Sequence, residues 1–192
     1  MQPIQRRVAG EVKNCLDNYA SSNLGRYPWA AQITDNPDLS LSDNSDTYFG
    51  RIPDSLYYTQ GDSSGQMDYR WSSCNTHSST TPAPWWNNWK EMVFYGLADK
   101  FKPNSLGAPI FQSTCSTPGN CININNSSTP ARYIVIVAGK KLSTPNQSLR
   151  NSNKTNAFYY LEGGNESADQ SGAYTFTQTP TSAIFNDTVV FQ

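Results

Sequence analysis

The feature that most constrains the fold is the run Arg132-Tyr-Ile-Val-Ile-Val-Ala138, in which apolar and mostly β-branched side chains follow one another without alternation. A strand with one face in water alternates apolar and polar residues, whereas a strand covered on both faces is apolar throughout. The run therefore predicts a central, buried strand. Shorter candidate strands precede it at 107–112 and 121–124 and follow it at 173–178 and 187–191.

The beginning of the chain has the pattern of an amphipathic helix over residues 4–20. Apolar side chains recur every three or four residues, and the face they form carries Val8, Val12, Leu16 and Tyr19. Charged side chains occupy the other faces. Because an apolar helix face must be buried against another element, we expect these four residues to pack on the sheet.

One helix near the start and several strands towards the end predict a single α+β domain over residues 1–192. We expect the helix over 4–24, a long irregular insertion over 25–105, and the sheet with its C-terminal loops over 106–192. Most of the insertion lacks a periodic apolar pattern. An apolar stretch near its end predicts a short helix at about 86–99.

Composition and charge bear on the compartment and on nucleic-acid binding. Only 15% of the residues are charged, against about 25% in typical globular proteins, and Ser, Thr, Asn and Gln supply the polar surface. This composition is typical of an exported or cell-surface protein. The 14 Lys and Arg and 15 Asp and Glu give a net charge of −1. Nucleic-acid binding usually needs a dense basic surface, so it is not indicated, although the charge balance leaves it open.

The four cysteines, Cys15, Cys74, Cys115 and Cys121, favour two disulfide bonds in an oxidising compartment. The segment Ser-Thr-Pro-Gly-Asn between the last two is rich in turn-forming residues, which can bring these two thiols within bridging distance. By elimination, the first two would pair and tie the helix to the middle of the chain. A zinc site is the alternative, which the lack of a Cys-x-x-Cys pair and the presence of a single histidine disfavour.

The sequence indicates no catalytic constellation, so we expect a protein that is not an enzyme. The only histidine that could act as a base is His77, and it lies in the polar run Asn-Thr-His-Ser-Ser, typical of an exposed loop. Phosphate-binding, dinucleotide-binding and metalloprotease motifs are absent from the sequence. Paired carboxylates that meet only in space remain open.

A Gly-rich segment carries three carboxylates close together, those of Glu162, Glu166 and Asp169. Oxygen-rich loops of this kind can hold calcium, although the spacing differs from that of an EF-hand. The alternative is a solvated turn without a ligand. The sequence indicates no other cofactor.

Three tryptophans, Trp85, Trp86 and Trp89, form an aromatic cluster in the sequence. Such a cluster can supply a binding surface for a sugar or for a partner protein. The alternative is an aromatic core packed beneath the long insertion.

Several segments, spread in order along almost the whole chain, resemble those of bacterial prepilin-type proteins, namely the minor pilins and pseudopilins. These segments are RVAGEVKNCLDNYA (7–20), GRYPWAA (25–31), GRIP (50–53), WWNNWK (85–90) running into VFY (93–95), IVIVA (134–138), YLEG (160–163) and NDTVV (186–190). The resemblance implies a pilin-like fold, in which the amphipathic half of a long N-terminal helix lies on an antiparallel sheet. It also implies an apolar first half of that helix, which we expect upstream of Met1.

The resemblance implies a structural or assembly subunit of a type IV pilus or a type II secretion filament. Its partners would be other pilin or pseudopilin subunits, contacted through the N-terminal helix. The protein would lie in the bacterial inner membrane and periplasm before assembly, and then in a cell-surface or periplasmic filament. The long irregular insertion favours a minor rather than a major subunit. The alternative, suggested by the aromatic residues, is a secreted module that binds carbohydrate or protein.

Overall fold

The computed structural model describes residues 2–57, 84–103, 115, 121–125, 127, 130–142, 145–167, 175–180, 182 and 185–192. At its centre is a four-stranded antiparallel sheet with the strand order β1-β2-β4-β6. The strands are β1 (Phe49–Arg51), β2 (Val93–Leu97), β4 (Tyr133–Val137) and β6 (Thr188–Phe191). A smaller parallel pair joins β3 (Asn123–Ile124) to β5 (Thr175–Phe176).

Strand β4 confirms the predicted central strand. It lies between β2 and β6, with Val135 opposite Tyr95 on one side and opposite Val190 on the other. All five of its residues are buried. Because no face of β4 meets water, its sequence has no polar alternation.

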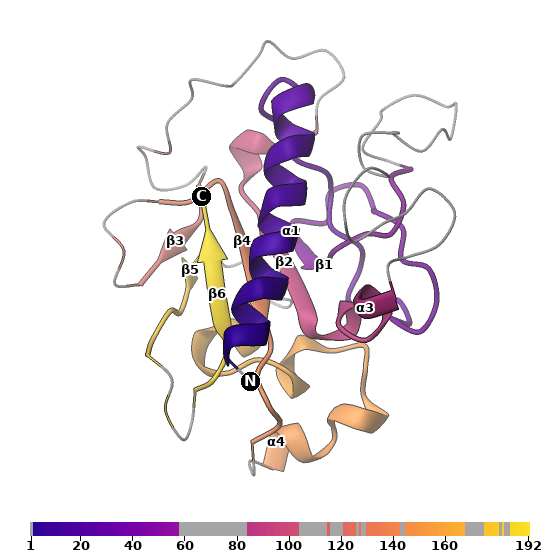
Figure 1. Cartoon of the computed structure of the whole chain (residues 1–192), viewed down its shortest axis with the longest axis vertical. Coiled ribbons are helices and arrows are strands. Elements are labelled where there is room, and N and C mark those ends of the chain that lie inside the picture. Colours follow the sequence, from indigo (N-terminus) through magenta and orange to yellow (C-terminus); the bar gives the residue numbers. More distant parts are fainter. Residues whose placement is uncertain are drawn as a thin grey trace.

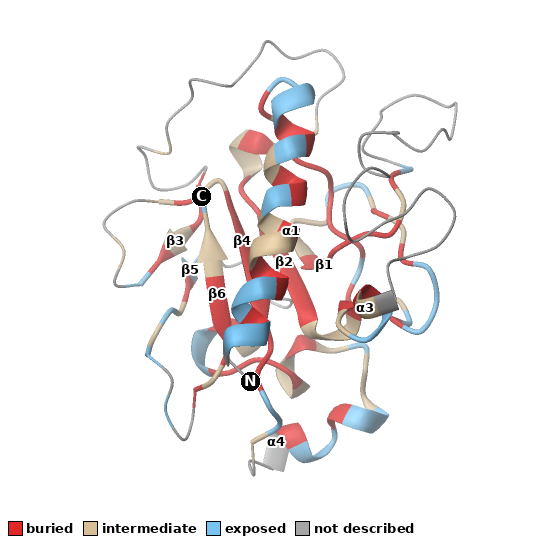
Figure 2. Cartoon of the chain, in the orientation of Figure 1, coloured by how far each residue is buried: buried red, intermediate tan, exposed pale blue. Residues whose placement is uncertain are grey.

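The long helix α1 (Gln2–Ser22) packs on this sheet, against β4 and β6, as Figure 1 shows. The four predicted packing residues are all buried, and the side chains of Val12 and Leu16 are 0% exposed. Figure 2 shows the opposite face of the helix as exposed to solvent. The expected α+β arrangement, with an N-terminal amphipathic helix on an antiparallel sheet, is therefore present.

Short elements connect and flank these layers. They are α3 (Pro84–Asn87), α4 (Pro145–Ser148) and the 3₁₀ turns Lys90–Met92, Asp99–Phe101, Arg150–Ser152, Ala157–Tyr159 and Gly163–Ser167. Figure 1 places α3 beside the N-terminal half of α1. In the described part of the chain, no helix combines the length and apolar character needed to cross a membrane.

The predicted helix at 86–99 is wrong. Only Pro84–Asn87 forms a turn of α-helix there, and the apolar stretch that follows is the strand β2. All five residues of β2 are buried, because it lies between β1 and β4. An apolar run without alternation fits a buried helix and a buried strand equally well, so its periodicity could not separate the two.

The expected division of the chain also needs correction, because the sheet is not confined to residues 106–192. Two of its four strands, β1 and β2, come from the segment 25–105 that was expected to be irregular. β1 is only three residues long, which is too short to produce a periodic pattern.

A glycine allows the backbone at Ala31 to pair with β1 along the edge of the strand that faces away from β2. The backbone N–H groups of Ala31 and Arg51 each donate to the carbonyl oxygen of the other, at 3.0 Å. A Cβ atom on Gly50 would collide with the carbonyl oxygen of Ala31. Glycine is therefore required at this close approach of two backbones.

The remaining strands are shorter in the structure than predicted. The candidates 121–124, 173–178 and 187–191 contain β3, β5 and β6, respectively. The candidate 107–112 lies outside the described residues, as does His77.

Candidate binding groove

The aromatic segment is anchored by one tryptophan. Trp86 is 0% exposed, and its Nε1 atom donates a hydrogen bond to Oδ1 of Asp54 at 3.0 Å. The other carboxylate oxygen, Oδ2, accepts from the backbone N–H of Leu41 at 2.9 Å and lies 3.4 Å from Nζ of Lys90. Asp54 and Lys90 are both buried, so this ion pair lies inside the protein. The structure thus corrects the assignment of Trp86 to a binding surface.

The other two tryptophans face a groove. Two tight turns follow α3, because Trp89 N donates to Trp86 O at 2.8 Å and Met92 N donates to Trp89 O at 2.7 Å. The ring of Trp85 meets that of Trp86 edge to face, with centroids 5.8 Å apart. Trp85 and Trp89 are half-buried and line the same groove, and their role in binding stays a prediction.

The opposite wall of the groove is the N-terminal half of α1. It contributes Ile4, Arg7, Val8 and Glu11, which are spaced by three or four residues and so share one side of the helix. Val8 is buried, whereas Ile4 is 54% exposed. The groove has a volume of about 500 Å³. Among the described residues, its lining combines apolar side chains with the cation of Arg7 and the anion of Glu11, which suits non-covalent binding of a small ligand.

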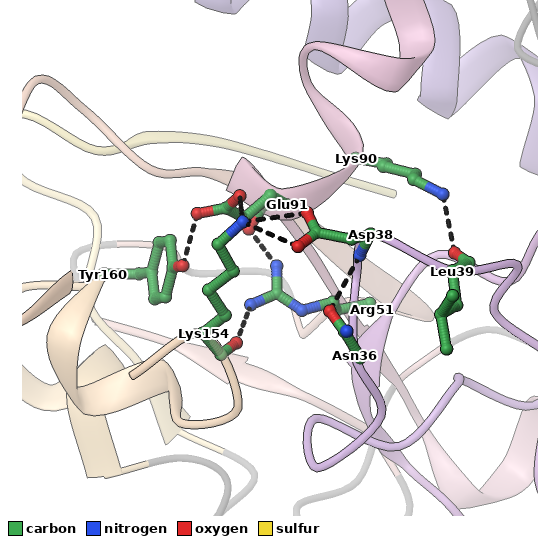
Figure 3. Close-up of polar contacts among 8 residues, drawn as sticks. All are labelled: Asn36, Asp38, Leu39, Arg51, Lys90, Glu91, Lys154 and Tyr160. Atoms are coloured by element: carbon green, nitrogen blue, oxygen red, sulfur yellow. Dashed lines mark hydrogen bonds and ion pairs between the residues drawn. The ribbon is translucent and has the colours of Figure 1, made fainter. Parts of the chain in front are cut away.

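A second polar cluster holds the turn that carries Trp89. Arg51 is 0% exposed, and its guanidinium lies between the rings of Phe94 and Tyr160, at 4.6 and 5.0 Å from their centroids. It donates to the backbone oxygens of Glu91 and Lys154, the latter at 2.7 Å. Burial lowers the pKa of Arg51 to about 10. Figure 3 shows this guanidinium between the segments that it joins.

The side chain of Glu91 completes this cluster. Its Oε1 atom accepts from the Tyr160 hydroxyl at 2.5 Å, and its Oε2 atom lies 3.3 Å from Nζ of Lys154. The same Nζ atom donates to Asp38 at 2.8 Å (Figure 3).

On the other side of the turn, Nζ of Lys90 donates to the Leu39 carbonyl at 2.7 Å. The turn Lys90–Met92 is therefore held from two directions, which fixes the position of Trp89 next to it.

The candidate calcium loop uses its first carboxylate for internal hydrogen bonds. Glu162 accepts from Gln147 Nε2 at 2.6 Å and from the backbone N–H groups of Asn186 and Asp187 at 2.8 and 3.1 Å. Burial raises the pKa of Glu166 above its usual value. Asp169 lies outside the described residues. Within the residues that are described, no group of three or more His, Cys, Asp or Glu side chains could hold a metal ion.

The disulfide predicted between Cys115 and Cys121 is confirmed, with their Cα atoms 5.7 Å apart. Cys15 is buried on α1, close to the apolar face that meets the sheet. Its predicted partner, Cys74, lies outside the described residues, so that pair stays a prediction.

Sequence reasoning identified the two groove tryptophans but missed the helix side chains opposite them. Arg7 and Glu11 belong to the charged residues on the other faces of the helix, and a single helix pattern shows which residues avoid the sheet but not what lies beside them. The ion pair of Asp54 and Lys90 could not be predicted either, because the two residues lie 36 positions apart in the sequence.

The chain was also compared with known proteins. No family model matches the sequence, and no significant match was found among curated proteins or solved structures.

Proposed function

We propose that this chain is a non-catalytic subunit of a filament of the type IV pilus or type II secretion class, assembled through its N-terminal helix. The observation that carries the proposal is the division of α1 into two faces. Val12 and Leu16 are fully buried against the sheet, whereas Asn14 and Asn18 are exposed on the other side. A helix fixed in this way presents an outer face, on the turns that carry Asn14 and Asn18, that neighbouring subunits can contact.

Two further observations support the proposal. The segments that resemble minor pilins and pseudopilins follow one another in the same order as in those proteins, and they include GRIP at 50–53 and IVIVA at 134–138. These two segments overlap β1 and β4, which belong to the sheet beneath the helix. The confirmed disulfide is consistent with an oxidising compartment such as the periplasm or the cell surface.

The outer face of α1 can be tested in cells that produce this protein. Asn14→Trp places a bulky side chain on this face, and Asn151→Trp places the same side chain on an exposed turn after α4. We expect the first variant to be lost from purified filaments and the second to be retained, with the two isolated proteins melting at the same temperature. Release of the wild-type chain as a free monomer, absent from any filament, would contradict the proposal.

A further inference from the structure

We infer that the groove between α1 and the segment 85–89 binds an uncharged saccharide. Throughout, the name tryptophan groove denotes the groove lined by Ile4, Arg7, Val8, Glu11, Trp85 and Trp89. The inference does not depend on filament assembly, because the site lies within one chain.

The aromatic walls provide the apolar part of such a site. A pyranose ring has an apolar face of C–H groups that stacks on indole, and it has hydroxyl groups around its edge. Trp85 and Trp89 are both half-buried, so each ring is partly open to the groove and partly supported by the protein. The edge-to-face contact between Trp85 and the fully buried Trp86 restrains the first ring.

The polar side chains of the tryptophan groove match hydroxyl groups. Arg7 supplies only hydrogen-bond donors and Glu11 supplies carboxylate acceptors, whereas a hydroxyl group both donates and accepts. The formal charges of these two side chains cancel. A nucleic acid or an acidic polysaccharide would require an excess of cationic groups, which the described lining of this groove does not have.

The size of the groove also favours a small ligand over a helical peptide. Its volume of about 500 Å³ falls within the range typical of small-molecule sites. A bound helix needs a continuous apolar channel that accepts side chains at i, i+3, i+4 and i+7. Here the charged pair Arg7 and Glu11 interrupts the apolar wall at one-turn spacing.

The tryptophan groove is preformed, because its aromatic side chains are already held in place without a ligand. The buried pair of Asp54 and Lys90 fixes Trp86, and the Arg51 cluster fixes the turn after Trp89. A site whose side chains are already held in place loses less conformational entropy when it binds. We therefore expect saccharide binding without a large rearrangement of the backbone.

The test uses the intact chain on an array of neutral and acidic glycans, followed by calorimetric titration of the strongest neutral ligand. We expect Trp89→Ala and Arg7→Ala each to weaken binding at least about tenfold, the loss of one stacking or charge-assisted contact. Tyr57→Ala is the matched control, because this aromatic side chain is 54% exposed and is not one of the residues that line the groove. It should leave the affinity unchanged.

Arg7→Ala keeps the test decisive if Trp89→Ala fails to fold, because Arg7 is exposed on α1. Three results would overturn the inference: no neutral glycan is bound, only acidic glycans are bound, or both variants bind as the wild type does. Filament incorporation is measured separately in cells. Failure of the glycan test therefore leaves the assembly proposal standing, and the reverse also holds.

Discussion

The hydroxyl group of Tyr133, in the central strand β4, donates a hydrogen bond at 2.7 Å to Oδ1 of Asp17 on α1. The other carboxylate oxygen of Asp17 lies 2.6 Å from Nζ of Lys13, one helical turn earlier. Tyr133 is buried, and this burial raises the pKa of its hydroxyl well above the usual value, so the group stays protonated and remains a donor. A polar link thus adds to the apolar contact between the helix and the sheet.

The first prediction concerns the apolar contact itself. Val12→Asp places an unpaired charge against the sheet, and we expect it to lower the free energy of unfolding by about 3 kcal/mol or more. Asn14→Asp puts the same carboxylate on the exposed side of the same helix and should change stability by less than about 0.5 kcal/mol. Denaturant unfolding followed by circular dichroism measures both. Similar losses in the two variants would show that Val12 does not face the sheet.

The second prediction concerns the buried ion pair beneath Trp86. Lys90→Met removes the cation from Asp54, and we expect a loss of about 3 kcal/mol, because an uncompensated carboxylate remains buried. The comparison variant is Lys102→Met, whose pair with Asp99 is more than one-third exposed, and its loss should be about 1 kcal/mol or less. Thermal melts of the two variants give the comparison, and equal losses would argue against a structural role for the buried pair.

The third prediction concerns the pH dependence of stability. Burial, and next the nearby charge of Glu162, raise the pKa of Asp187 well above its usual value. The folded protein therefore holds this proton at pH values at which the unfolded chain has lost it. The contribution of Asp187 to stability is complete below the ordinary aspartate pKa of about 3.9, and it declines as the pH rises towards the raised value.

The variant Asp187→Asn removes this titration while keeping a side chain of similar size. The free energy of unfolding of the wild type, minus that of the variant, should therefore fall as the pH increases from about 4. Urea unfolding at a series of pH values measures it. The backbone N–H groups of Gly139 and Glu162 donate to Asp187, so a constant offset from lost hydrogen bonds is expected in addition. If the free energy of unfolding of the wild type, minus that of the variant, instead rises with pH, the predicted direction of the pKa shift is contradicted.

The fourth prediction concerns the cysteines. The confirmed bond between Cys115 and Cys121 closes a short loop, so Cys115→Ser with Cys121→Ser should lower stability by only about 2 kcal/mol. We also predict the bond between Cys15 and Cys74. Thiol titration of the denatured, unreduced wild-type protein should then find no reactive thiol, whereas two reactive thiols would refute the second bond.

The sequence predicted those parts of the fold in which one element alone carries a strong pattern. The apolar spacing of Val8, Val12 and Leu16 indicated the buried face of α1, and the run at 132–138 indicated β4. Both elements are long enough for their burial to show in the residue order. By contrast, β1 covers three residues and is recognised only through its pairing with β2 and its close approach to Ala31.

The candidate site was less predictable, because it depends on contacts between distant parts of the chain. Trp85 and Trp89 were evident as aromatic residues, but Trp86 between them points into the core. The residue that decides this is Asp54, which accepts the hydrogen bond of the indole. In the sequence, Asp54 stands between Ile52-Pro53 and Ser55-Leu56, and nothing in that order indicates a contact with Trp86.

The most direct test of the central claim is photo-cross-linking in cells that make this protein. A benzophenone amino acid at Asn18, on the exposed face of α1, should cross-link the chain to a neighbouring filament subunit. The same group at Asn151 serves as the control away from the helix. Cross-links to a second subunit from Asn18 but not from Asn151 are the result that we predict. A chain that gives no cross-link from Asn18 and is recovered only as a free monomer would contradict assembly through α1.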